Sequence, residues 1–225
     1  EEARDPLCCI NATFKELSEM GYRTEVVDQI SPDEAINVTD RVSLSSATEV
    51  MRRHILRQLM QGGVTIIDPY SVYIDAQVKV GIDTQILPGT MLQGDTVVGE
   101  RCVIGPNSRI ASSVLGNGVT VESSVVVDDG TKVGPFAYIR PGSNVGKNVK
   151  IGDFVEIKKS RIGDDTKISH LTYVGDAEVG RNVNIGCGVV FVNYDGKVKS
   201  KTVVGDNAFI GCNTNLVAPV EVEEV

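Results

Sequence analysis

Aliphatic residues recur at every sixth position through about two-thirds of the chain. One run occupies residues 74–110, and a second run, shifted by one residue, occupies residues 115–157. The register shifts again at Ile162 and at Val179, and an insertion precedes the last run. An α-helix repeats every 3.6 residues and a strand every two, so a period of six predicts a different architecture.

Six-residue periodicity is typical of a parallel β-helix, in which each unit is a short strand followed by a turn. Glycine often follows the aliphatic residue, as in Val98-Gly99 and Ile151-Gly152, where a tight corner favours a residue without a side chain. With three units per coil, the repeat predicts roughly eight coils and a prism on the order of 40 Å long. Such a prism resembles the left-handed parallel β-helix of the hexapeptide acyltransferases, and its handedness is expected from that resemblance alone. The predicted fold class is therefore mainly β.

The repeat has two possible roles, a purely structural scaffold or a framework that holds a functional site. Its regularity fails between residues 152 and 202, and the polar residues of interest gather in that region. Departures from an otherwise consistent pattern are expected at functional sites. We therefore expect the function to lie there.

Residues 1–41 do not follow the repeat. The pattern predicts a helix over residues 11–20 that ends at Gly21, a strand over residues 22–30, and a capping box beginning at Ser31. So few elements cannot bury a core alone. We expect this segment to be a small α/β remnant, the end of a larger domain.

Residues 42–62 form a predicted linker helix between this remnant and the β-helix of residues 63–225. Gly62-Gly63 ends the helix. Its inward positions recur at intervals of three and four residues and are Leu44, Ala47, Met51, Ile55 and Leu59.

Composition narrows the class of partner. The chain has 225 residues, is 41% hydrophobic and carries a formal charge of −8. It contains no apolar run long enough to span a bilayer and no signal pattern, which predicts a cytoplasmic protein without a membrane partner. The negative charge argues against nucleic acid, because phosphate neutralisation needs a basic face.

The five cysteines show no metal-type spacing and are expected to be reduced thiols. Cys102, Cys187 and Cys212 lie at small-residue positions of the repeat, which favours packing over reactivity. The two histidines, His54 and His170, are too few for a three-histidine zinc site within one chain. We predict no metal site, and we interpret His54 as a helix residue without a catalytic duty.

The irregular region contains a cluster of candidate binding residues. Arg140 and Lys158 are eighteen residues apart, so a three-sided coil stacks one above the other. Two stacked cations repel each other, which favours an anion between them, and a phosphate fits best. The alternative is a pair of cations that simply face solvent.

His170 is the one base of this region whose unperturbed pKa lies near neutrality. Register shifts precede and follow it, which favours a role as general base over a structural role. Residues 192–202 interrupt the repeat as a polar loop, which indicates a site closed against a neighbouring prism.

Four motifs carry a resemblance to a known family: GPFAYIRPG, GDFVEIKKSRIG, HLTYVGDAEVG and NYDGKVKSKT. They are similar to the acetyltransferase part of the bifunctional bacterial N-acetylglucosamine-1-phosphate uridyltransferase/glucosamine-1-phosphate N-acetyltransferase family. The resemblance covers nearly the whole chain, and it makes residues 1–41 the end of the uridyltransferase domain.

The resemblance implies acetyl transfer from acetyl-coenzyme A to glucosamine 1-phosphate, in UDP-N-acetylglucosamine biosynthesis, by a homotrimer with sites between subunits. It implies that His170 is the general base. The residues implied for the sugar phosphate are Arg140, Lys158, Tyr173, Asn184, Asn193 and Lys199. Those implied for coenzyme A are Cys187, Asn193, Tyr194 and Cys212.

Two departures from the family pattern bear on function. The nucleotide-binding body of the uridyltransferase is missing, so its UTP and magnesium chemistry is expected to be missing too. The β-helix is expected to be truncated after Val225, which leaves the coenzyme A site incomplete. A trimeric scaffold without turnover, or an acyltransferase for a different amine, are the alternatives.

Overall fold

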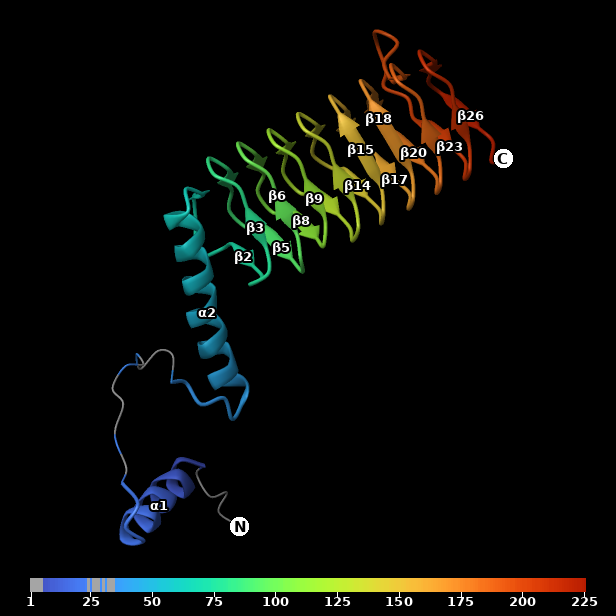
Figure 1. The fold of residues 1–225 in the computed structure, drawn as a ribbon. Coiled ribbons are helices and arrows are strands. Elements are labelled where there is room, and N and C mark those ends of the chain that lie inside the picture. Colours follow the sequence, from blue (N-terminus) through green and yellow to red (C-terminus); the bar gives the residue numbers. More distant parts are fainter. Residues whose placement is uncertain (1–5, 24, 26–28, 30, 32–34) are drawn as a thin grey trace. The chain divides into compact units, whose positions relative to one another are not determined.

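The computed structural model describes residues 6–23, 25, 29, 31 and 35–225 (Figure 1). The chain divides into two compact units, residues 1–50 and residues 51–225. The second unit contains the whole β-helix.

Two helices precede the β-helix, α1 (Pro6–Glu19) and α2 (Arg41–Gln61). Helix α1 includes most of the predicted helix of residues 11–20 but begins earlier, and Gly21 follows it with a φ of 85°. The predicted strand over residues 22–30 is wrong for Tyr22, Arg23, Glu25 and Gln29, none of which lies in a strand. The rest of that strand and residues 32–34 of the predicted capping box lie outside the described residues.

Helix α2 matches the predicted linker helix to within one residue at each end. Its predicted inward face is wrong in part, because Leu44 and Met51 are more than half exposed. Leu56 is the buried residue, at 2% exposure, and Ile55 and Leu59 pack beside it against the core. Within the described part of the chain, neither helix is long and apolar enough to cross a membrane. The three-part domain division stays a prediction.

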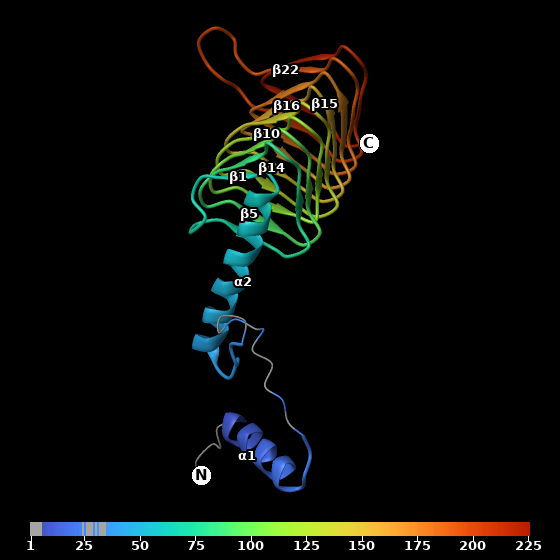
Figure 2. The same cartoon turned by 60° about the vertical axis from the view of Figure 1, so that its left-hand side comes forward.

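The β-helix has three faces, each a parallel sheet (Figures 1 and 2). Face A contains β1 (Thr65–Ile66), β4 (Gln85–Ile86), β7 (Val103–Ile104), β10 (Thr120–Val121), β13 (Tyr138–Ile139), β16 (Glu156–Lys158), β19 (Tyr173–Gly175), β22 (Val190–Val192) and β25 (Asn215–Val217). Face B contains β2 (Tyr73–Ile74), β5 (Met91–Gln93), β8 (Arg109–Ala111), β11 (Val126–Val127), β14 (Asn144–Val145), β17 (Arg161–Ile162), β20 (Ala177–Val179), β23 (Thr202–Val204) and β26 (Val220–Val222). Face C contains β3 (Lys79–Val80), β6 (Val97–Val98), β9 (Val114–Leu115), β12 (Lys132–Val133), β15 (Lys150–Asp153), β18 (Lys167–His170), β21 (Asn184–Ile185) and β24 (Phe209–Ile210).

The aliphatic repeat forms the core, as predicted. Most strands bury one aliphatic residue of the repeat, and side chains such as Ile104, Ile139 and Ile157 are fully buried. Val80 and Val222, near the two ends of the repeat, are only partly buried. Two faces have nine strands, one coil more than the predicted eight, because the first coil already begins at β1. The parallel β-helix is thus confirmed, and its handedness stays a prediction.

Buried hydroxyl groups link successive coils at the corners. The side chain of Thr166 donates to the carbonyl of Gly180 at 2.8 Å and accepts the Val183 N–H at 3.1 Å. Thr202 is equally buried, but its hydroxyl lacks a hydrogen-bond partner among the described residues. The two threonines are therefore a matched pair that differs in hydrogen bonding.

We expect Thr202→Val to raise the free energy of unfolding by about 1 kcal/mol, because it removes an unsatisfied buried hydroxyl. The same change at Thr166 leaves the Val183 N–H unpaired, and we expect it to cost about 1–3 kcal/mol. Urea unfolding of both variants measures the difference. Equal destabilisation by both would contradict the assignment of Thr202 as unpartnered.

The irregularities of the repeat lie mostly at one corner. The register shifts at Ile162 and at Val179 both arise between face A and face B, and so does the loop of residues 193–201 (Figure 2). Neither shift lies directly beside His170, which is at the corner between face C and face A. The shifts instead reshape the corner that contains Lys158.

Candidate functional site

The first part of the site is a group of polar residues at and beside the corner between face A and face B. Ile139 pairs with Ile157, so Arg140 and Lys158 are neighbours in successive coils, as the eighteen-residue spacing predicts. Lys158 in turn pairs with Gly175 of the next coil. We define the basic cluster as Arg140, Glu156, Lys158, Tyr173, Asp176, Asn193 and Lys199.

Two cations of the basic cluster, Arg140 and Lys158, form ion pairs with carboxylates. Arg140 Nη1 lies 2.9 Å from Glu156 Oε1, and Lys158 Nζ lies 3.3 Å from Asp176 Oδ2. Each of these two cations therefore has a carboxylate partner, which offsets the repulsion expected between Arg140 and Lys158. Side chains alternate along a strand, so Glu156 and Lys158 point to the same side of β16. Arg140 is the neighbour of Lys158 in the preceding coil, so Glu156 is within its reach.

Asp176 connects three members of the basic cluster. The same carboxylate oxygen, Oδ2, accepts hydrogen bonds from Lys158 Nζ and Asn193 Nδ2. Asn193 Nδ2 also lies 3.5 Å from the Tyr173 hydroxyl. The ring of Tyr173 lies over Gly175, where any Cβ atom would come within 2.3 Å of the hydroxyl oxygen. Gly175 thus lets Tyr173 reach the corner.

Lys199 adds an unbalanced positive charge. Burial by itself would lower the pKa of Lys158, but the nearby Tyr173 and the hydrogen bond and charge of Asp176 contribute to raising it overall. The close approach of the positively charged Lys158 is the main cause that lowers the pKa of Lys199. Since the basic cluster contains three cationic side chains and two carboxylates, an anionic group bound beside Lys199 would offset the excess charge.

The second part of the site is His170, at the corner between face C and face A. Its Nδ1 lies 2.6 Å from Asp153 Oδ1, and both side chains are partly exposed. This hydrogen bond is the main cause that holds the pKa of Asp153 below its ordinary value, so the carboxyl is ionised at neutral pH. An ionised carboxylate only accepts hydrogen bonds, so Nδ1 carries the proton and Nε2 is left as the basic nitrogen.

Asp153 was missed by the sequence reasoning. Its strand pairs with that of His170 in parallel register, Asp153 opposite His170. The close approach depends on Gly152, where a Cβ atom would lie only 1.6 Å from the Ser169 carbonyl oxygen. The sequence contains the information needed to find Asp153. The register shift at Ile162 shortens this coil to seventeen residues, which is the separation of Asp153 and His170.

Cys187 and Cys212 lie at the same corner in the next two coils. Each directly follows a glycine after a face C strand and directly precedes a left-handed residue, as Asp153 and His170 precede Phe154 and Leu171. The N–H of Asn213 donates to the Cys187 carbonyl at 2.8 Å, which fixes the stacking of the two turns. Cys187 is half-buried and Cys212 is exposed.

The structure groups some predicted residues and separates others. It brings Arg140, Lys158, Tyr173, Asn193 and Lys199 into one cluster. Tyr194 lies on the projecting loop, bridged to Lys199, and its hydroxyl donates to Gly196. Asn184 lies on face C, opposite Lys167, and no described contact joins it to the basic cluster.

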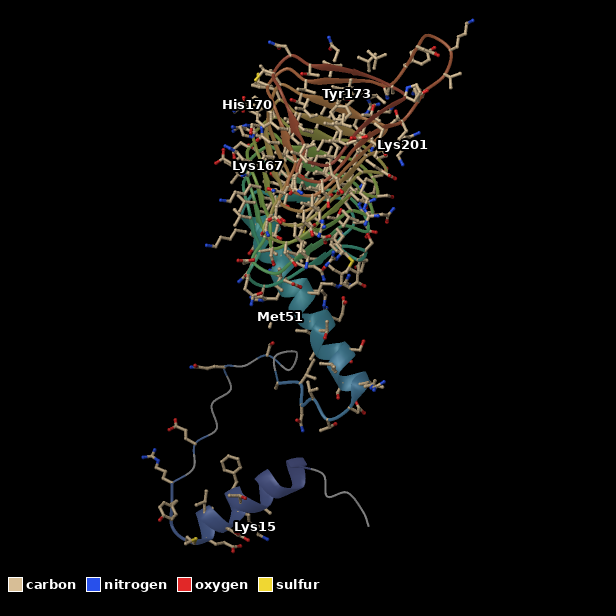
Figure 3. All side chains as sticks on the ribbon, turned by 90° about the vertical axis from the view of Figure 1, so that its right-hand side faces the viewer. Lys15, Met51, Lys167, His170, Tyr173 and Lys201 are labelled. Atoms are coloured by element: carbon tan, nitrogen blue, oxygen red, sulfur yellow. The ribbon has the colours of Figure 1, made fainter. Side chains whose placement is uncertain are left out.

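His170 and the basic cluster lie at the two ends of the same face. Figure 3 shows His170 and Lys201 at opposite edges of the β-helix, with Tyr173 between them. His170 precedes β19 and Asp176 follows it. Five residues, 171–175, lie between His170 and Asp176, so the two parts of the site are at most about 20 Å apart along the chain.

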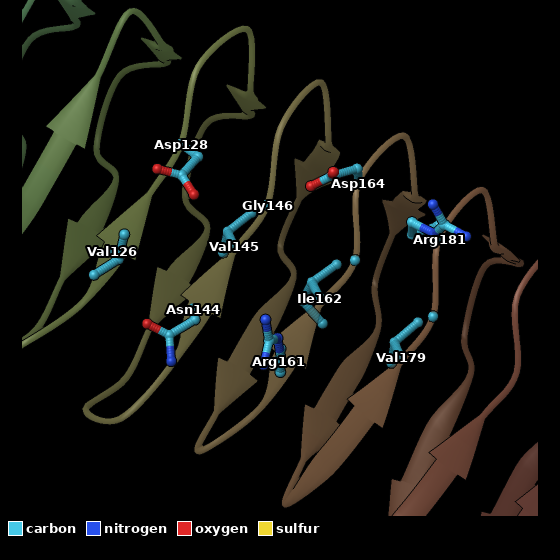
Figure 4. A pocket seen from close by; sticks show the side chains of 12 residues that line it. Val126, Asp128, Asn144, Val145, Gly146, Arg161, Ile162, Asp164, Val179 and Arg181 are labelled. Carbon is cyan, nitrogen blue, oxygen red and sulfur yellow. The ribbon is translucent and has the colours of Figure 1, made fainter.

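A groove of about 520 Å³ lies elsewhere, on face B (Figure 4). Arg161 and Arg181 point toward it together with Asp128 and Asp164, and Arg181 is paired with Asp206. None of the predicted site residues lines this groove. Among the described residues, no group of three histidine, cysteine or acidic side chains could hold a metal ion.

Comparisons with known proteins agree with the repeat. The bacterial transferase hexapeptide family (six repeats) matches residues 77–112, and the GMPPB C-terminal domain family matches residues 121–192. Among solved structures, Arabidopsis UDP-N-acetylglucosamine acyltransferase is 18% identical, covers 67% of this chain and 65% of its own, and has a TM-score of 0.44.

Curated relatives match over more of the chain. The bifunctional protein GlmU of Acetivibrio thermocellus is 57% identical over 216 residues, which are 94% of this chain and 47% of that protein. GlmU of Clostridium kluyveri is 58% identical over 196 residues, which are 85% of this chain and 43% of that protein.

The coils and the family match define a hexapeptide-repeat β-helix protein. The particular relatives of this chain are the bifunctional GlmU proteins, which confirms the resemblance found in its motifs. The chain spans about half the length of the curated relatives it matches.

Proposed function

We propose that this chain carries the acetyltransferase site of a GlmU-type protein and transfers an acetyl group from acetyl-coenzyme A to the amine of glucosamine 1-phosphate. The observation that supports it best is the Asp153–His170 pair on the same face as a cluster with an excess positive charge. A base and an anion-binding group at opposite ends of one face suit an amine substrate that carries a phosphate.

The sugar phosphate lies along β19 in this proposal. Lys158 and Lys199 hold the phosphate, with Arg140 one coil away, and the Tyr173 hydroxyl and Asn193 contact the sugar. The amine points toward His170 Nε2.

The reaction needs alignment and proton removal but no covalent enzyme intermediate. The substrate nitrogen attacks the thioester carbonyl carbon, and His170 Nε2 takes the proton of the nitrogen as the C–N bond forms. Asp153 stabilises the charged imidazole through Nδ1–H. The C–S bond then breaks, and coenzyme A leaves as a thiolate that takes up a proton.

The acetyl-coenzyme A end of the proposal rests on the motif resemblance. Cys187 and Cys212 lie at the corner of His170, whereas Asn193 and Tyr194 lie at or near the base of the loop on the other side of face A. A neighbouring copy in a homotrimer brings such separated surfaces together, and we propose this assembly for the chain. We also propose that Asn184 contributes to binding of the sugar phosphate and that the protein is cytoplasmic. The uridyltransferase activity, with its magnesium, belongs to the part of the relatives that this chain does not span.

Thiol release from acetyl-coenzyme A tests the proposed function directly. We expect release in the presence of glucosamine 1-phosphate and little release with glucosamine, because the basic cluster recognises the phosphate. Equal release with both amines would favour an acyltransferase for a different amine. Binding of the sugar phosphate in a calorimeter without any thiol release would favour a scaffold without turnover.

Asp176→Asn tests the basic cluster. Loss of the negative charge removes the ion pair of Lys158 and replaces a charged acceptor of Asn193 with a weaker neutral one, so both side chains are held less firmly. We expect KM for glucosamine 1-phosphate to rise about tenfold, with a smaller change in kcat, since the loss falls on binding. Steady-state kinetics measure this split.

Glu178→Gln is the matched control for Asp176→Asn. Glu178 lies two residues further along the chain and pairs with Lys201 on the outer surface, outside the basic cluster. We expect its KM to stay within about twofold of the wild-type value. A similar rise in both variants would mean that overall charge, and not Asp176, sets the affinity.

A further inference from the structure

We propose that Cys187 and Cys212 form a reversible disulfide on exposure to peroxide, which makes this corner of the β-helix an oxidation site. Both are free thiols in the structure, and they occupy equivalent positions in adjacent coils. No part of the acetyl-transfer chemistry needs two thiols there.

The neighbouring pair at this corner shows that side chains at these positions can meet. Asp153 and His170 also occupy equivalent positions in adjacent coils, and their side chains approach to 2.6 Å. The turns of Cys187 and Cys212 stack in the same way, since Ile185 pairs with Ile210 and the Asn213 N–H donates to the Cys187 carbonyl. Successive coils are about 4.8 Å apart, which lies within the Cα separations that disulfides span, about 4.4–6.8 Å.

The two thiols differ in accessibility in the way that a sensor pair requires. Cys212 is exposed and can meet an oxidant from solvent, whereas Cys187 is half-buried behind it. An accessible cysteine beside a resolving cysteine is the usual arrangement of redox-sensing thiols, and intracellular disulfides are mostly of this transient kind.

The chemistry consumes one peroxide molecule per disulfide. The Cys212 thiolate attacks a peroxide oxygen, the O–O bond breaks, and a sulfenic acid and hydroxide form. The Cys187 thiolate then attacks the sulfenic sulfur and displaces a second hydroxide. The two protons of the thiols convert both hydroxides to water, so two thiols and hydrogen peroxide give one disulfide and two waters.

Closure alters the corner next to His170. Ile168 pairs with Ile185, and His170 and Cys187 each lie two residues after these paired isoleucines. Cys187 therefore lies one coil beyond His170. A disulfide fixes the Cys187 side chain toward Cys212 and removes both thiols from the surface that acetyl-coenzyme A is proposed to approach. The expected loss of acetyl transfer rests on the proposed function, whereas the disulfide itself does not.

Peptide mapping tests the disulfide independently of activity. Cleavage after lysine and arginine places Cys187 in residues 182–197, Cys212 in residues 202–225, and Cys102 in residues 102–109. After treatment with a small excess of hydrogen peroxide, we expect the first two peptides to be joined, two hydrogens lighter than their sum. Dithiothreitol should separate them. Cys102 is the internal control, because it is fully buried and burial is the main cause that raises the pKa of its thiol.

A Cys187→Ser variant makes the order of events visible. We expect it to stop at a Cys212 sulfenic acid, which dimedone traps, and to form no joined peptide. In the wild-type chain, dimedone labelling should be at least tenfold lower, because Cys187 resolves the sulfenic acid. Activity of the oxidised wild type should fall at least fivefold relative to the reduced form, and the Cys212→Ser variant should show an oxidised-to-reduced ratio near one.

Two results would overturn the inference. One is recovery of both cysteines oxidised separately in a folded chain. The other is a joined peptide that arises only between two chains, seen as a dimer on a non-reducing gel. A disulfide that forms in a chain without acetyl transfer would support the oxidation site and count against the proposed function.

Discussion

Replacing His170 with alanine lowers the rate of acetyl transfer by about 10²–10⁴-fold, the usual contribution of a positioned general base. The loss is expected in kcat, since the phosphate of the substrate is proposed to bind at the other end of face A. Asp153→Asn gives a smaller loss of the same kind, because an amide donates as well as accepts and no longer selects the Nδ1–H form of His170. Thiol release at saturating glucosamine 1-phosphate measures both variants.

His54→Ala is the matched control for this experiment, since His54 is the one other histidine of the chain. It is exposed on α2 and contacts Gln58. We expect its rate to equal that of the wild type. A rate for His170→Ala that equals the control would remove His170 as the base and leave the Asp153 pair as a structural contact.

Gly152→Ala is the substitution with the largest expected effect on stability. The added methyl group would lie 1.6 Å from the Ser169 carbonyl oxygen, so two coils must move apart. Overpacking of this severity in a buried strand is expected to cost about 3 kcal/mol or more. Gly152 directly precedes Asp153, so the same movement separates Asp153 from His170. Urea unfolding and thiol release together measure the two consequences.

Gly211→Ala is a control at a glycine with space beside it. The nearest atom to an added Cβ there is the Thr214 hydroxyl oxygen at 3.9 Å, an ordinary contact, and the φ of Gly211 is not left-handed. We expect the free energy of unfolding to change by less than about 1 kcal/mol. If both variants unfold at the same urea concentration, the close approach at Gly152 does not limit stability.

The core could be predicted almost residue by residue, because a solenoid repeats one local rule. Burial at a sixth-residue position depends only on the strand and turn around it, so Ile104 and Ile157 could be placed without knowing the rest of the fold. Helix α2 was less predictable. Its length follows from local pattern, but the choice of Leu56 as its buried residue depends on packing against the first coils, which the helix sequence does not encode.

The residues of the candidate site could be chosen from the sequence by their chemistry, but their pairing could not. His170 and Lys158 could be chosen by their chemistry. Their partners, Asp153 and Asp176, come from neighbouring coils, so finding them requires a count of coil length that includes each register shift. The assignment of those shifts to one corner also requires knowing which face each strand occupies.

The projecting loop has a consequence for how the chain folds. Most strands pair with a partner seventeen or eighteen residues away, so each coil closes a chain loop of nearly constant length. The loop raises this separation to twenty-five residues where β20 meets β23. Loop-closure entropy grows only with the logarithm of length, so the longer connection costs about 0.3 kcal/mol. A solenoid can therefore gain or lengthen such a loop at almost no thermodynamic penalty, while the coils on either side keep the same order of assembly.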